Sequence, residues 1–342
     1  MSTRAFITGV SGLELTADER DFLRAERPWG FILFKRNIET PDQILRLVGE
    51  LRESVADSDA PVLIDQEGGR VQRFGPPYWP VYPPGALFGT LYDIDRGLGL
   101  SAARLSARLI AADLYETGVT VDCLPLADVP VAGADAVIGN RAYGTEPAKV
   151  AAIARAVTEG LQQGGILPVL KHIPGHGRAT ADTHFGLPVV DTPKSELERT
   201  DFAAFQPLAD LPMAMTAHVV FSALDPAQPA TTSATIIEQV IRGVIGFQGL
   251  LMSDDVSMNA LAGSIAERTR AIVGAGCDMV LHCNGKLDEM REVAAETPEL
   301  SGRALERAAR ALASRQPPRP FDRTAARAEL DALITRAGTA GA

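Results

Sequence analysis

Eight short apolar segments recur along the chain, and helical stretches separate them. The segments are 5–11, 30–36, 61–67, 119–126, 166–172, 212–220, 249–256 and 277–284. Their apolar residues are continuous rather than alternating with polar ones, which is typical of strands buried on both faces of a parallel sheet. The pattern therefore predicts eight parallel strands.

The stretches between these segments carry helix signals. The stretch 16–28 opens with Thr16 and has Glu19 three residues later, which forms a capping box. The stretch 40–54 opens with Thr40 and has Pro41 at its first helical position. Further helices are predicted at 99–118, 145–165, 192–208, 232–246, 264–276 and 285–296, with a Pro-rich loop at 75–89 and a helical hairpin at 301–338.

Eight strand–helix units in a chain of 342 residues predict a (β/α)8 barrel, whose usual length is roughly 200 to over 400 residues. An open doubly wound sheet is the alternative. It would be expected to carry a GxGxxG motif after the first strand, whereas "ITGVSGLEL" has only two glycines in GxxG spacing. We predict one domain over 1–342, with the helical extension at about 301–338 packed outside the barrel.

Polar residues gather where the predicted strands end. They are Asp65, Gln66, Glu67, Asp122, Lys171, His172, His218, Ser253, Asp254, Asp255, His282 and Asn284. Because the active sites of (β/α)8 barrels are built at the C-terminal ends of the strands, this distribution predicts a functional site there.

The stretch "KHIPGHGRATADTHFGLP" contains three of the five histidines, at positions 172, 176 and 184. A zinc site, the base of a serine or cysteine nucleophile, and a glycosidase acid/base are all compatible with it. The first strand lacks an HxH pair and the chain lacks a GxSxG motif, which weakens the first two hypotheses. Asp182 can accept the imidazole N–H of His184 and raise its basicity, and "SDD" offers a carboxylate partner at Asp254.

Composition excludes several other classes of function. The net charge is −10 and no cluster of Lys and Arg occurs, which argues against a nucleic-acid binder. Three widely spaced cysteines are no disulfide framework. No segment approaches the ~18 apolar residues of a membrane helix, and the first residues lack the apolar core of a signal peptide. We therefore expect a cytoplasmic protein that binds neither nucleic acid nor membrane.

Four motifs, "KHIPGHG…ADTH", "IDQEGGRVQRF", "AVIGNRAYG" and "GLLMSDDVSM", together resemble those of glycoside hydrolase family 3. The similarity is to its single-domain bacterial β-N-acetylglucosaminidases, which work in cell-wall recycling. This resemblance implies a (β/α)8 barrel without metal or cofactor. It also implies retaining hydrolysis through a covalent glycosyl-enzyme. The expected substrate is a small molecule, a muropeptide with a non-reducing terminal N-acetylglucosamine (GlcNAc), and we expect a monomer.

Matched onto this chain, the resemblance assigns Asp254 as the nucleophile, His184 as the acid/base and Asp182 as its partner. The implied sugar-binding residues are Asp65, Arg73, Arg141, Lys171 and His172. Ile173 and Thr183 depart mildly from the usual motifs "KHFPGHG" and "DSH". A β-glucosidase or β-xylosidase of the same family, and a non-catalytic sugar-binding barrel, are the alternatives. The intact "DTH" and "SDD" argue against a non-catalytic sugar-binding barrel, because a binding module needs no paired acid and nucleophile.

Overall fold

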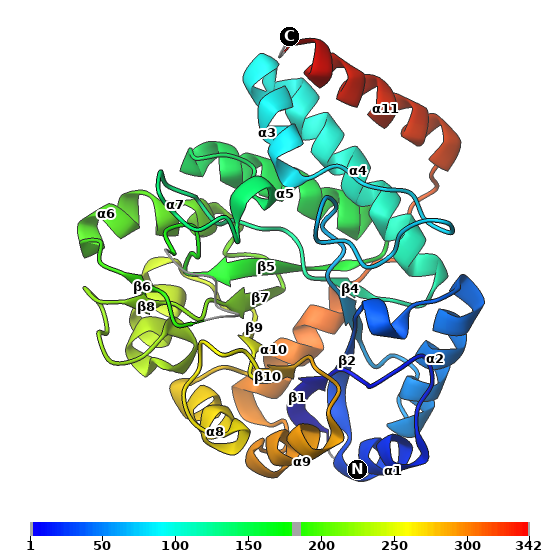
Figure 1. Cartoon of the computed structure of the whole chain (residues 1–342), viewed down its shortest axis with the longest axis vertical. Coiled ribbons are helices and arrows are strands. Elements are labelled where there is room, and N and C mark those ends of the chain that lie inside the picture. The colour runs from blue at the N-terminus through cyan, green and yellow to red at the C-terminus, as the bar shows by residue number, and fades with distance from the viewer. Residues whose placement is uncertain (1–2, 180–185, 341–342) are drawn as a thin grey trace.

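The apolar segments pair side by side into a closed barrel. The computed structural model describes residues 3–179 and 186–340, and within them eight parallel strands close in the order β1, β10, β9, β7, β5, β4, β3 and β2 (Figure 1). These strands are β1 (Arg4–Thr8), β2 (Pro28–Leu33), β3 (Val62–Ile64), β4 (Val121–Asp122), β5 (Leu167–Ile173), β7 (Met213–Thr216), β9 (Leu250–Asp255) and β10 (Met279–His282). The predicted (β/α)8 barrel is confirmed.

Helices surround the barrel in the places that the sequence pattern predicts. They are α1 (Ala17–Glu26), α2 (Pro41–Ser54), α4 (Arg96–Glu116), α5 (Pro147–Gln163), η5 (Ile236–Val244), α8 (Ile265–Ala275) and α9 (Leu287–Glu296). The Thr16 side chain accepts a hydrogen bond from the Glu19 N–H, and the Thr40 side chain accepts one from the Gln43 N–H. Side-chain caps of this kind satisfy backbone donors at a helix start.

Two segments differ from the prediction. The stretch 192–208 is divided into α6 (Lys194–Arg199), α7 (Asp201–Phe205) and a short 3₁₀ turn, instead of one helix. The predicted loop 75–89 ends early, because helix α3 (Gly85–Ile94) begins inside it. Gly85 and Gly89 leave no room for a side chain, since an added Cβ would lie 2.1 Å from the Arg141 carbonyl oxygen and 2.0 Å from that of Tyr143. Helix α3 is therefore built for close approach to the backbone that carries Arg141.

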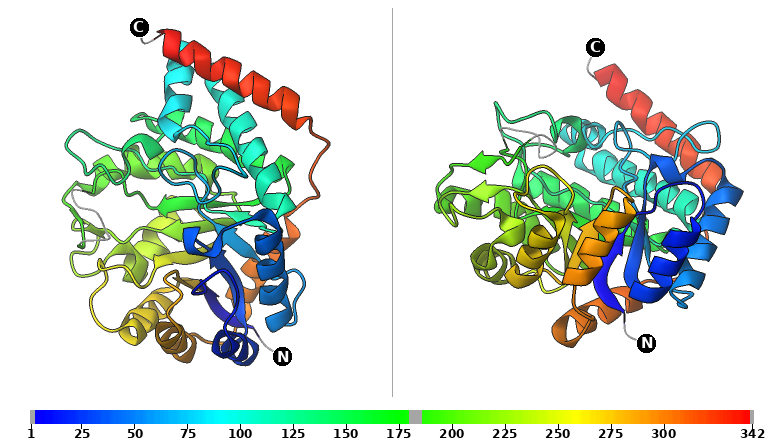
Figure 2. Two further views of the ribbon diagram at one scale, coloured as in Figure 1. Left: turned by 45° about the vertical axis from the view of Figure 1, so that its right-hand side comes forward. Right: turned by 60° about the horizontal axis from the view of Figure 1, so that its bottom comes forward.

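The last two helices, α10 (Gly302–Ala313) and α11 (Arg323–Ala340), do not form the predicted hairpin. Ala308 and Ala311 of α10 pack with the side chains inside the barrel, so α10 covers its N-terminal end. An extended segment then leads to α11, which lies across α3 and α4 (Figures 1 and 2). An amphipathic pattern shows that a helix buries one face, but it does not show against which surface.

Side chains on alternate strand residues fill the inside of the barrel. Val169 and Leu167 of β5 belong to the interior cluster, whereas Leu170 packs outward against the helices. Leu250 and Met252 of β9 face inward in the same way, and Leu251 faces outward. Both strand faces are buried, as the continuous apolar segments predicted.

Two further strands, β6 (Val189–Val190) and β8 (Val220–Phe221), form a small parallel pair outside the barrel. Among residues 3–179 and 186–340, no helix is long and apolar enough to cross a membrane.

Candidate active site

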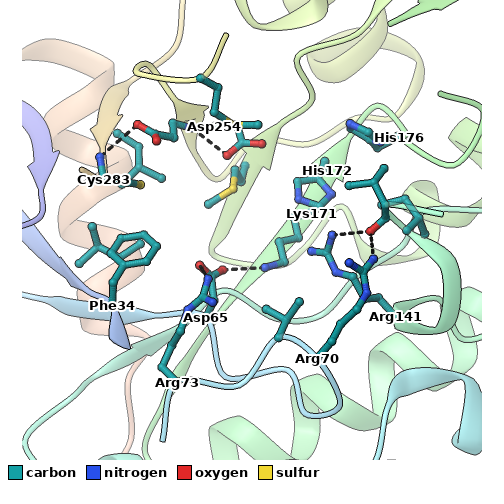
Figure 3. A pocket seen from close by; sticks show the side chains of 18 residues that line it. Phe34, Asp65, Arg70, Arg73, Arg141, Lys171, His172, His176, Asp254 and Cys283 are labelled. Carbon is teal, nitrogen blue, oxygen red and sulfur yellow. Dashed lines mark hydrogen bonds and ion pairs between the residues drawn. The ribbon is translucent and has the colours of Figure 1, made fainter. Parts of the chain in front are cut away.

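The two-residue period of the strands directs three charged side chains into the mouth of the barrel. Lys171 continues the inward series of β5, Asp254 continues that of β9, and Asp65 follows inward-facing Leu63 of β3 by two residues. All three line one cavity of about 280 Å³ at the C-terminal end of the barrel (Figure 3). This position is where (β/α)8 enzymes carry out their chemistry.

A buried network of ion pairs forms the floor of this cavity. The Lys171 Nζ lies 2.9 Å from an Asp65 oxygen and 2.7 Å from a Glu67 oxygen. Arg73 contacts the other Asp65 oxygen at 3.1 Å, and Arg141 binds both Glu67 oxygens, at 2.7 and 2.9 Å. Only 2% of the Lys171 side chain is exposed, so water does not screen these charges.

The ion pairs decide the protonation states of the floor. Burial by itself would raise the pKa of Glu67, but the charges of Lys171 and Arg141 lower it to about 2. Burial opposes ionisation of Asp65 too, and Lys171 and Arg73 hold its pKa well below the ordinary value. Conversely, burial would lower the pKa of Lys171, and the two carboxylates raise it. At neutral pH the floor therefore presents fixed charges, which can hold the hydroxyl groups of a ligand in one orientation.

The two adjacent aspartates of β9 have different surroundings. Asp255 turns away from Asp254 and accepts hydrogen bonds from the N–H groups of Ser257 (3.0 Å) and Cys283 (3.1 Å). The Asp254 carboxylate faces the cavity and accepts the Asp255 N–H at 2.7 Å (Figure 3). Burial would raise the pKa of Asp254, but at the acidic pH where a carboxyl group titrates the imidazoles carry a proton, and the charges of His218 and His172 keep the pKa below its ordinary value. Asp254 is thus an ionised carboxylate, as a nucleophile must be.

Two histidines form the wall beside Asp254. The His172 Nδ1 lies 2.8 Å from an oxygen of Asp128, a fully buried carboxylate at the end of the fourth strand–loop unit. The other Asp128 oxygen accepts the backbone N–H groups of His172 (3.2 Å) and His176 (2.7 Å). The His176 side chain is 3% exposed, and burial together with nearby His172 lowers its pKa to about 4. The His176 ring is therefore neutral at physiological pH.

The structure brings together most of the residues assigned from the sequence. Those lining the cavity are Asp65, Arg73, Arg141, Lys171, His172 and Asp254. Arg141 reaches the site through its paired contact with Glu67. Asp182 and His184 lie outside the described residues, so their assignment rests on the sequence.

Several lining or supporting residues were not assigned from the sequence. They are Phe34, Arg70, Met215 and Met258 on the cavity wall, and Asp128 behind it. Asp128 had a recognisable signal, since a carboxylate within the apolar run "LPLADVP" must find partners when it is buried. Tyr78 and Trp79, two aromatic residues of the Pro-rich loop 75–89, do not line this cavity; Trp79 stacks on Phe74 with ring centroids 4.3 Å apart.

Metal binding was one hypothesis for the histidine-rich stretch. Within the part of the chain that the structure describes, no group of three or more His, Cys, Asp or Glu side chains is arranged to hold a metal ion. The side chains that face the cavity offer hydrogen-bond donors and acceptors and the ionised carboxylates of Asp65 and Asp254. This set suits recognition of a polyhydroxylated ligand and attack on it.

Comparisons with known proteins agree with this geometry. β-Hexosaminidase from Alkalilimnicola ehrlichii is 39% identical over 280 residues, covering 81% of this chain and 79% of the relative. β-Hexosaminidase from Xanthomonas axonopodis pv. citri is 38% identical over 309 residues, with 89% of each chain covered. The crystal structure of NagZ from Neisseria gonorrhoeae in complex with N-trifluoroacetyl-D-glucosamine matches with a TM-score of 0.84 and 30% identity, covering 98% of both chains.

The model of the glycosyl hydrolase family 3 N-terminal domain matches residues 8–314, which include every barrel strand except the first residues of β1. That span contains the ion-paired floor and Asp254. The family match, these relatives and the barrel with a carboxylate at its mouth all lead to the same conclusion. The chain belongs to glycosyl hydrolase family 3 and is a glycoside hydrolase.

Proposed function

We propose that this protein is a retaining β-N-acetylglucosaminidase that removes non-reducing terminal GlcNAc from peptidoglycan-derived muropeptides. Asp254 forms the covalent glycosyl-enzyme, and Asp182 with His184 forms the acid/base pair. Residues 1–342 act as one catalytic domain, in the cytoplasm and without a metal. The observation that carries the proposal is the ionised Asp254 carboxylate, which faces a cavity floored by fixed charges.

The reaction follows from the chemistry of these groups. Asp254 attacks the anomeric carbon as the bond to the leaving oxygen breaks, and protonated His184 gives its proton to that oxygen. Neutral His184 then takes a proton from water, whose oxygen attacks the anomeric carbon and releases Asp254. An imidazole with an ordinary pKa of about 6.5 can perform both steps near neutral pH, whereas a carboxylic acid would need its pKa raised by burial.

The cavity supports a single sugar ring as the bound group. Its volume of about 280 Å³ is just below the roughly 300–1,000 Å³ usual for small-molecule sites, so it has room for a small ligand. Asp65, Lys171 and Arg73 supply polar contacts for ring hydroxyls, and Met215 and Met258 add apolar surface. The β-hexosaminidase relatives and the N-acylated glucosamine bound to the Neisseria protein favour an N-acetylated sugar.

A hydrolysis screen tests this proposal. Purified protein is assayed with aryl β-N-acetylglucosaminide, aryl β-glucoside and aryl β-xyloside at equal concentration. The proposal predicts turnover of the N-acetylglucosaminide at least about tenfold above the others. Preference for the glucoside or the xyloside would indicate a β-glucosidase or a β-xylosidase of the same family instead. Binding without turnover of any substrate would indicate a sugar-binding barrel.

A further inference from the structure

A second pairing of aspartate with histidine, Asp128 with His172, lies in the wall of the cavity. We propose that Asp128 is a positioning residue that fixes the neutral His172 ring with its Nδ1–H turned away from the cavity. The Nε2 lone pair is then presented to the ligand, and His172 accepts a hydrogen bond from a sugar hydroxyl. This inference rests on the proposed function, because it specifies how the same site recognises its sugar.

The first step of the argument is that Asp128 can only accept hydrogen bonds. Its side chain is fully buried, and burial alone would raise its pKa. At the acidic pH where a carboxyl group titrates, the charge of the protonated His172, its hydrogen bond and the nearby His176 instead lower the pKa of Asp128 to about 2, so Asp128 stays ionised at neutral pH. An ionised carboxylate has no proton to give, so each of its partners must donate.

The second step is that all three partners are placed to donate. One Asp128 oxygen accepts two backbone N–H groups, from His172 at 3.2 Å and from His176 at 2.7 Å. The other oxygen lies 2.8 Å from the His172 Nδ1. Because a neutral imidazole carries one proton, a proton on Nδ1 leaves Nε2 as the acceptor.

The third step concerns the donors and acceptors around His172 in the cavity. Lys171, Arg73 and Arg141 can only donate, and Asp65 already accepts from two of them. His172 borders the same cavity beside Lys171 (Figure 3). A neutral acceptor there binds the hydrogen of a sugar hydroxyl without adding another charge near Asp254. The His172 Nε2 thereby adds a neutral acceptor to the ionised carboxylates of Asp65 and Asp254 in the same lining.

The substitution Asp128→Asn reverses this polarity with little change in shape. The Asn oxygen can still accept the two backbone N–H groups, but its NH₂ group then faces the His172 Nδ1. That contact requires a lone pair on Nδ1, so the ring proton moves to Nε2 and the ring becomes a donor toward the ligand. Asp122→Asn is a control at a similar depth, since Asp122 is also a fully buried acidic side chain near the barrel mouth and accepts the Gln66 N–H instead of a histidine N–H. Burial raises the pKa of Asp122, so this substitution removes no charge that faces a histidine.

The experiment measures how each enzyme discriminates hydroxyl from fluorine. Aryl N-acetylglucosaminides with fluorine in place of the 3-, 4- or 6-hydroxyl are compared with the parent substrate. Fluorine cannot donate, so one position should lower kcat/KM of the wild type and of Asp122→Asn by roughly ten- to a hundredfold. In Asp128→Asn, the parent substrate should lose activity and this fluorine penalty should shrink by about fivefold or more. Equal penalties in wild type and Asp128→Asn would overturn the inference.

A second measurement does not depend on the folding of that variant. NMR of the wild type with ¹⁵N-labelled histidine reports the tautomer of each neutral ring, and His172→Gln assigns the His172 signals. The inference predicts a proton on Nδ1 alone for His172 at neutral pH, whereas a proton on Nε2, alone or together with one on Nδ1, would overturn it. Absence of turnover by the wild type would instead contradict the proposed function, and the tautomer measurement would still decide the role of Asp128.

Discussion

Lys171→Met removes the central charge from the floor of the site while keeping most of the side-chain volume. In the wild type, Lys171 lies between the carboxylates of Asp65 and Glu67, at 2.9 and 2.7 Å. The substitution leaves these two buried carboxylates without their shared cation. Each retains one arginine partner, Arg73 for Asp65 and Arg141 for Glu67. The expected result is a large loss of folding stability at neutral pH.

The magnitude follows from the ionisation of Glu67. The cations lower its pKa from 4.5 to about 2, which corresponds to about 3 kcal/mol in favour of the folded, ionised state. Breaking a buried ion pair by removing one partner typically costs about 3–5 kcal/mol. Arg141 contributes part of the lowering of the Glu67 pKa, which reduces the loss, whereas Lys171 also stabilises ionised Asp65, which increases it. We therefore expect the free energy of unfolding to fall by about 3 kcal/mol at pH 7.

The sign of the pH dependence follows from the same pKa. A depressed carboxyl pKa stabilises the folded state above the unfolded value of 4.5, and this contribution is lost as the pH falls through about 2. In Lys171→Met, the carboxylates become protonated at a higher pH, which relieves their repulsion. The difference in stability between wild type and variant should therefore be largest at pH 7 and should narrow toward pH 4.

Urea denaturation, with reversibility checked by refolding, gives the free energy of unfolding at both pH values. Lys149→Met is the control, because Lys149 also forms a 2.6 Å ion pair, with Asp93, but the Asp93 side chain is 67% exposed. That substitution should cost less than about 1 kcal/mol. A loss below about 1 kcal/mol for Lys171→Met, or a loss that is the same at pH 7 and pH 4, would refute the account of the floor.

Three further predictions concern the site and its support. Gly85→Ala should raise KM and lower stability by about 1–3 kcal/mol, since its Cβ would lie 2.1 Å from the Arg141 carbonyl oxygen. Gly49→Ala is the control and should leave kinetics unchanged, because its Cβ would meet nothing within 4 Å besides its chain neighbours and its own helix backbone. His184→Ala should reduce kcat/KM much more for substrates with poor leaving groups than for activated aryl glycosides, and equal losses would argue against His184 as the acid. Activity should remain within about twofold of its initial value after dialysis against EDTA. A loss of activity that an added metal ion restores would instead support the hypothesis of a metal site.

The barrel and the centre of the site could be predicted because both follow from local pattern. Continuous apolar segments indicate strands buried on both faces, and the two-residue period then places Asp65, Lys171 and Asp254 on the inner surface at the strand ends. Capping residues such as Thr16 and Thr40 located helix starts for the same local reason.

The remaining features depend on contacts between distant parts of the chain. Arg141 binds Glu67 across 74 positions of sequence, and Asp128 holds His172 across 44. The start of α3 was predicted as loop because the sequence there is rich in Pro and Gly. The glycine at position 85 is explained only by the tertiary structure, in which it packs directly against the Arg141 backbone. Helices α10 and α11 were predicted as helices, but the surfaces that receive them are formed by the rest of the fold.

The central claim is that Asp254 becomes covalently bonded to the sugar during turnover. A slow mechanism-based substrate, an aryl or fluoride N-acetylglucosaminide with fluorine at ring carbon 5, should accumulate the glycosyl-enzyme, and peptide mass spectrometry can locate it. The account predicts one added sugar mass on the peptide containing "SDD", at Asp254, and none in Asp254→Ala. A sugar bonded to any other residue, or steady turnover by Asp254→Ala, would contradict it.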